Sequence, residues 1–102
     1  MSVQALSWVF DYSPTTGSDR LVLLAIANHA DVDGAHSFPG IDTLAREARV
    51  SRATAKRAIR GLEDHQHIDV VHGVGRGHPN LYRVITDSGR VGTRRPLPAH
   101  NA

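Results

Sequence analysis

The sequence predicts a mostly helical α+β fold, in which three to four helices precede a C-terminal β-hairpin. Three observations support this prediction. Apolar residues recur at helical spacing through most of residues 3–65, two short segments follow at 68–72 and 80–85, and glycines gather between those segments. A chain of 102 residues is long enough for one domain with a modest core.

The first two helices are expected in the N-terminal third of the chain. A helix over 3–11 is expected from the roughly helical spacing of Val3, Leu6, Val9 and Phe10. Turn-forming residues at 13–17 predict a loop. Ser18 or Asp19 is then expected to cap a helix that runs to Ala30. That helix is apolar nearly all round, which is typical of a helix buried by neighbours on several sides.

Two more helices are expected in the middle of the chain. A turn at 31–34 and a short extended piece at 36–38 lead into them. A helix over 41–48 would bury one face, made of Ile41, Leu44, Ala45 and Ala48. Ser51 is a good N-cap for a further helix over 52–65.

The C-terminal part predicts a hairpin and a tail. Residues 68–72 and 80–85 would pair as two strands, joined by the glycine-rich loop 73–79. Beyond Thr86 the sequence lacks apolar periodicity. We therefore expect residues 1–86 to form the domain, and 87–102 to be a disordered basic tail.

Charge is distributed unevenly along the chain, although its net value is only +2. Residues 1–42 carry −4 and residues 61–75 carry −3, whereas residues 43–60 carry +5 and residues 76–102 carry +4. A basic centre and a basic end indicate a polyanionic partner.

Residues 42–62 have the spacing of two helices that cross and are joined by a tight turn. Ala45 is small where the helices would cross, Val50 is an apolar residue in the turn, and Ser51 would start the second helix. The second helix would bury Ala55, Ile59 and Leu62. Thr54 would lie at the margin of its exposed face, which consists of Arg52, Ala53, Lys56, Arg57 and Arg60. A helix of about 13 residues is roughly 20 Å long and fits a major groove.

On these features, residues 20–85 resemble the winged helix-turn-helix domains of phage and plasmid replication proteins and of small bacterial and phage regulators. The segments that carry the resemblance are 21–30, 33–34, 38–39, 43–45, 51–62 and 80–84. The resemblance implies that the helix from Arg52 is the recognition helix and that loop 73–79 is the wing. The chain departs from the family at Arg49, where glycine is frequent, and at Ala55, where a larger aliphatic residue is frequent. A residue other than glycine adopts the left-handed conformation at some cost, so Arg49 is expected to strain the turn slightly.

The resemblance implies double-stranded DNA as the partner. No cofactor is expected, because the motif spacings for a metal or a nucleotide are absent. The expected DNA-binding residues are Thr43, Ser51, Arg52, Ala53, Thr54, Lys56, Arg57, Arg60, Arg76 and His78. Arg76, at the wing tip, would reach a phosphate or a minor groove.

Other kinds of site are not supported by the residue spacing. There is no cysteine, and neither His65 nor His67 belongs to a helical i, i+4 histidine pair, so no metal site is expected. The glycines at 73–77 are not followed by a Lys-Ser/Thr pair or by a helix, which argues against a nucleotide loop. Residues 31–42 match a calcium loop only in length, because His36 stands where glycine is required. No catalytic arrangement of side chains is evident, and we expect a binding protein that is not an enzyme.

The favoured function is a small transcriptional regulator of phage, plasmid or prophage origin. A replication-initiation or recombination accessory factor is the alternative within DNA binding, and a winged-helix protein-interaction module is the alternative from another class. The longest apolar run, 21–27, is too short to span a bilayer, so we expect a location in the bacterial cytoplasm or in a phage-infected host cell. No heptad or additional dimerisation helix is visible, which predicts a monomer in solution with pairing on DNA left open.

Overall fold

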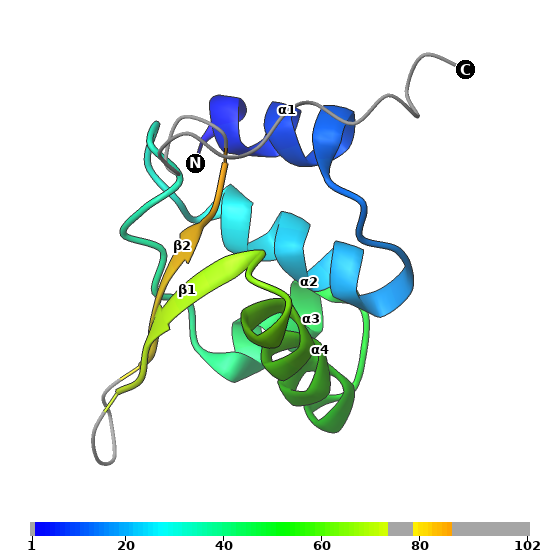
Figure 1. The fold of residues 1–102 in the computed structure, drawn as a ribbon. Coiled ribbons are helices and arrows are strands. Elements are labelled where there is room, and N and C mark those ends of the chain that lie inside the picture. Colours follow the sequence, from blue (N-terminus) through cyan, green and yellow to red (C-terminus); the bar gives the residue numbers. More distant parts are fainter. Residues whose placement is uncertain (1, 74–78, 87–102) are drawn as a thin grey trace.

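The computed structural model describes residues 2–73 and 79–86, and it confirms the predicted fold class. Four helices and one antiparallel two-stranded sheet occupy these residues (Figure 1). Their bounds are α1 Val3–Tyr12, α2 Gly17–Asn28, α3 Ile41–Ala48, α4 Arg52–Asp64, β1 Ile68–Val71 and β2 Leu81–Val84. The expected tail, 87–102, and the tip of the expected wing, 74–78, lie outside the described residues.

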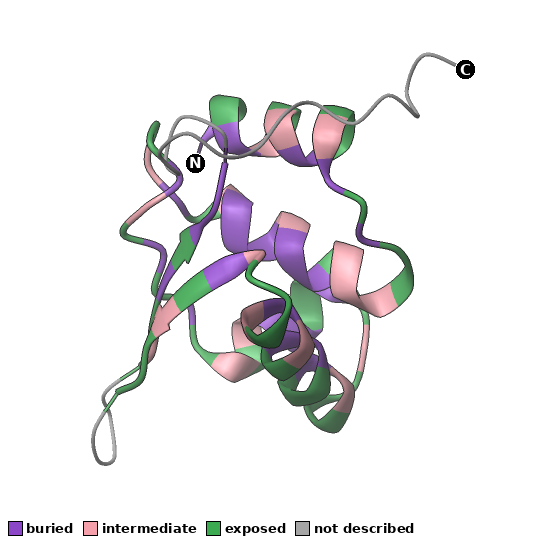
Figure 2. Ribbon diagram, viewed as in Figure 1, coloured by how far each residue is buried: buried purple, intermediate pink, exposed green. Residues whose placement is uncertain are grey.

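Helix α2 is the centre of the core, as its apolar sequence predicts. It contacts α1, α3, α4 and β2, and its side chains Val22, Leu23 and Ile26 are fully buried. Figure 2 shows buried residues along this helix, between α1 and α4. Leu21, in contrast, is exposed. Burial of three large aliphatic side chains stabilises the domain by about 1.5–3 kcal/mol each.

The start of α2 differs from the prediction. The N-cap residue is Thr16, so the expected cap at Ser18 or Asp19 is wrong. Gly17 has φ +58, a conformation that glycine adopts without strain, and it turns the chain into the helix before Ser18 is reached. Asp19 instead lies in the first turn, where its negative charge interacts favourably with the helix dipole.

Helix α1 covers one side of α2 through a narrower face than its sequence suggests. Ala5 and Val9 are buried one turn apart, whereas Val3 and Phe10 are exposed. The guanidinium of Arg20 lies 5.6 Å from the centre of the Phe10 ring and donates a hydrogen bond to the Val9 carbonyl at 3.3 Å. Phe10 therefore contributes to the link between α1 and α2 from the solvent side.

The hairpin packs its inner face against the helices. Strands β1 and β2 are antiparallel, with Ile68 opposite Val84 and Val71 opposite Leu81. Tyr82 and Val84 are buried, while the residues that alternate with them in β2 are exposed, as in a strand with one face on the core. Both strands are one or two residues shorter than predicted.

The extended piece expected at 36–38 forms a single bridge with β2. The backbone N–H of Ser37 donates to the Tyr82 carbonyl at 3.1 Å, and the N–H of Tyr82 donates to the Ser37 carbonyl at 2.6 Å. The buried Ser37 hydroxyl donates to the carbonyl of Ile26 at 2.8 Å. These bonds fix the segment before α3 between the hairpin and α2.

Candidate nucleic-acid interface

Helices α3 and α4 are joined by a turn of three residues. At the end of α3, Arg49 adopts the left-handed conformation, with φ 62 and ψ 43. The N–H of Val50 then donates to the carbonyl of Ala45 at 3.0 Å, a bond that closes a helix end of the Schellman type. Ala45 is buried, as expected for the residue at the helix crossing. The strain expected at Arg49 therefore lies in the bend that sets the direction of α4 relative to α3.

The N-cap predicted at Ser51 is confirmed. Its hydroxyl oxygen accepts a hydrogen bond from the Thr54 N–H at 3.1 Å and lies 3.0 Å from the Thr54 hydroxyl. The Thr54 hydroxyl oxygen also accepts a hydrogen bond from the Arg57 guanidinium at 3.1 Å. The cap, its neighbour and the arginine thus form one chain of hydrogen bonds, which restrains Arg57 on the exposed side of the helix.

The buried face of α4 consists of small and medium side chains. Ala55, Ile59 and Leu62 are buried, as predicted, and so is Ala58, which the sequence analysis missed. Ala58 lies three residues after Ala55, a spacing that could have identified it. The two alanines allow α4 to approach α2 and α3 closely.

The exposed face of α4 is strongly basic over its first three turns. Its exposed residues there are Arg52, Ala53, Lys56, Arg57 and Arg60, and Thr54 is half-buried at the edge. The last turn instead carries the acidic residues Glu63 and Asp64. Positive charge is therefore concentrated toward the N-terminal end of the helix.

An ion pair that the sequence analysis missed connects this face to α3. The Nε of Arg52 lies 3.1 Å from a carboxylate oxygen of Asp42, and both side chains are mostly exposed. Thr43, another of the predicted site residues, follows Asp42 in α3 and is half-buried. An exposed pair of this kind contributes about 0–1 kcal/mol, so an incoming phosphate can displace the Asp42 carboxylate at little cost.

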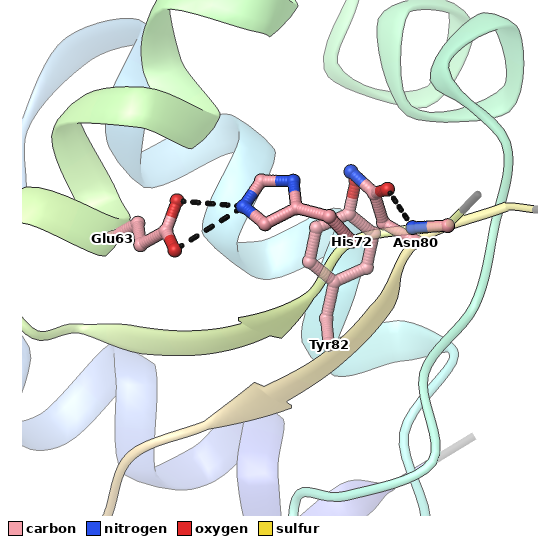
Figure 3. Close-up of polar contacts among 5 residues, drawn as sticks. Glu63, His72, Asn80 and Tyr82 are labelled. Carbon is pink, nitrogen blue, oxygen red and sulfur yellow. Dashed lines mark hydrogen bonds and ion pairs between the residues drawn. The ribbon is translucent and has the colours of Figure 1, made fainter.

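A groove of about 390 Å³ separates α4 from the base of the hairpin. Lys56, Arg60 and Glu63 line it from α4, and His72, Asn80 and Tyr82 line it from the hairpin side. Figure 3 shows the His72 ring pointing toward Glu63, with its Nε2 at 3.3 Å from both carboxylate oxygens. Ile41, predicted as a core residue, is only partly buried because it lines the same groove.

The base of the hairpin is closed by a side chain. The Oδ1 of Asn80 accepts a hydrogen bond from the Gly73 N–H at 2.8 Å, and the Nδ2 of Asn80 lies 3.4 Å from the Tyr82 hydroxyl (Figure 3). Burial raises the pKa of Tyr82, and the Asn80 contact partly opposes that effect. These contacts fix the positions from which the two ends of the loop leave the sheet.

Two of the predicted DNA-binding residues, Arg76 and His78, lie outside the described residues. Within 2–73 and 79–86, no three His, Cys, Asp or Glu side chains gather as a metal site would require. None of the helices described is long and apolar enough to cross a membrane.

Comparison with known proteins agrees with this geometry. A family model described as a helix-turn-helix domain matches residues 16–68, slightly more than half of the chain. The match extends from the N-cap of α2 to the first residue of β1 and includes the whole of α3 and α4. No curated protein and no solved structure matches the chain.

Proposed function

Because the chain belongs to the helix-turn-helix domain family, we propose that it is a binding protein that docks the exposed face of α4 in the major groove of double-stranded DNA. The observation that carries this proposal is the basic surface of the first three turns of α4. Helix-turn-helix proteins contact base edges with the N-terminal residues of this second helix. The acidic residues Glu63 and Asp64 lie at the opposite end of α4, away from the expected contact.

Arg57 is the residue best placed to read a base. It lies opposite the buried face of α4, and its guanidinium is restrained by the Thr54 hydroxyl. An arginine held in this way can donate two hydrogen bonds to the O6 and N7 atoms of guanine. Ala53 lies one turn before Arg57 on the same face, where its methyl group could contact a thymine methyl.

Lys56 and Arg60 are proposed to bind the DNA backbone. Both line the groove between α4 and the hairpin, so a phosphate that enters this groove meets two positive charges. Contacts to phosphate fix the position of the protein on the duplex and carry little sequence information. Arg76 and His78 are assigned to the wing contact on the sequence alone.

The biological role that we propose is regulation of transcription by a protein of phage, plasmid or prophage origin. The support is the resemblance of residues 20–85 to small regulators with winged helix-turn-helix domains. A restrained base-reading arginine suits such a role, because a regulator must distinguish its operator from other DNA.

The proposal is tested by selecting bound duplexes from a random pool and comparing the wild type with Arg57→Ala. The variant should bind the selected sequence about 1–3 kcal/mol more weakly and lose its preference at one base position. Arg46→Ala is the matched control, since it removes the same charge from an exposed arginine of α3 that is assigned to neither proposed interface. Equal effects of the two substitutions, or enrichment of no sequence by the wild type, would contradict sequence recognition by α4.

A further inference from the structure

The outer face of the hairpin carries an exposed apolar row. Val71 lies opposite Leu81 across the sheet. The antiparallel bridge between Ser37 and Tyr82 sets Phe38 beside Leu81 on the other side of β2. Phe38, Leu81 and Val71 are 61%, 36% and 66% exposed, so the described residues leave much of this row open to solvent.

A charged row runs beside the apolar one. Arg83 lies opposite Asp69, and its Nε donates a hydrogen bond to a carboxylate oxygen of Asp69 at 3.2 Å. Both side chains are about half exposed. The pair is neutral overall, unlike the basic face of α4, so this surface is not suited to a polyanion.

We propose that this face pairs with the same face of a second copy of the chain. We place a two-fold axis above the outer face of the hairpin, parallel to the strands and midway between β1 and β2. This axis would set Arg83 of each copy opposite Asp69 of the other. The same axis would set Leu81 of each copy opposite Val71 of the other. Leu81, Val71, Arg83 and Asp69 match their own images in this way, as an isologous interface requires.

The direction of the axis determines which side of the pair the two DNA-binding grooves face, an inference that rests on the proposed function. Rotation about an axis parallel to the strands preserves strand direction, so both hairpins direct their loop ends to the same side of the pair. The groove that contains Lys56 and Arg60 is bordered by His72 and Asn80, at the loop end of the hairpin. Both basic grooves therefore face one side of the pair, where a single duplex with an inverted repeat can meet them.

The pairing is expected to be weak. Three apolar side chains per copy are far fewer than the roughly 20–30 residues a side of a stable interface. The monomer expected from the sequence is then the dominant species in dilute solution, and the pair forms at high concentration or on adjacent DNA half-sites.

Sedimentation equilibrium of the full chain without DNA, from micromolar to millimolar concentration, tests the proposal independently of the DNA-binding function. The wild type should show a monomer–dimer equilibrium. Val71→Asp should raise the dimer dissociation constant at least about tenfold, because a carboxylate would be buried without a partner. Val32→Asp is the control, since Val32 is exposed to nearly the same extent, 63%, in the turn after α2. A chain that stays monomeric throughout, or equal effects of the two substitutions, would overturn the proposal.

A charge exchange tests the orientation of the axis. Asp69→Arg alone, or Arg83→Asp alone, should prevent self-association, because like charges would then face each other across the axis. An equimolar mixture of the two variants should form a heterodimer, in which opposite charges face each other again. Adding Val71→Asp to both variants should abolish that heterodimer. A mixture that remains monomeric, or a heterodimer that tolerates Val71→Asp, would contradict this arrangement.

Discussion

Replacing Ser51 with alanine removes the side-chain cap of α4 and leaves the rest of the helix unchanged. The Thr54 N–H then loses its 3.1 Å bond to the Ser51 hydroxyl. Loss of such a cap costs about 1 kcal/mol of unfolding free energy. In a domain of this size that change lowers the melting temperature by roughly 4–8 °C. Thermal unfolding followed by circular dichroism at 222 nm measures the shift.

Two further substitutions at Ser51 separate stability from binding. Ser51→Gly should cost only a few tenths of a kcal/mol, because glycine is tolerated at an N-cap. Ser51→Asp should preserve the cap and the melting temperature, yet weaken DNA binding, since its carboxylate would lie beside the proposed DNA backbone. If Ser51→Ala melts within about 1 °C of the wild type, the side-chain cap does not stabilise α4.

Two other substitutions probe strain and burial. Arg49→Gly should raise the unfolding free energy, measured by urea denaturation, by about 0.5–1 kcal/mol. Glycine relieves the left-handed strain of the folded state, and the added entropy of the unfolded chain offsets only part of that gain. An unchanged or lowered value would argue against strain at this turn. Burial raises the pKa of Tyr82 above its ordinary value of 10.0. The neutral phenol therefore stabilises the fold at lower pH, and this contribution to the unfolding free energy is lost as pH rises through the folded-state pKa. As pH rises above that ordinary value, the melting temperature of the wild type should therefore fall more than that of Tyr82→Phe, and parallel decreases would contradict the shift.

Features set by neighbouring residues were predicted well from the sequence. The bounds of α3 follow from its apolar spacing, and the cap at Ser51 follows from a hydroxyl residue placed before a basic helix. The left-handed conformation of Arg49 follows from its place in the turn, where the family frequently has glycine. In each case the responsible interactions span five residues or fewer.

Specific contacts between side chains that are distant in the sequence were not predicted. The Asp42–Arg52 pair joins two helices, and the His72–Glu63 contact joins the hairpin to α4. Such contacts require the relative placement of elements, which residue spacing does not contain. The predicted start of α2 is wrong for a different reason: the helix begins without a side-chain cap, because Gly17 at positive φ turns the chain into it directly after Thr16.

The role of α4 as the DNA-reading helix is tested most directly by the triple variant Arg52→Ala/Lys56→Ala/Arg57→Ala. Its binding to the selected duplex and to random DNA is measured against salt concentration, after circular dichroism has shown that the variant is folded. Affinity for the selected duplex should fall toward that for random DNA, and the slope of log affinity against log salt should decrease by about 0.9 for each phosphate that the variant no longer neutralises. A folded triple variant that binds the selected duplex as tightly as the wild type, with the same salt slope, would contradict DNA recognition by α4.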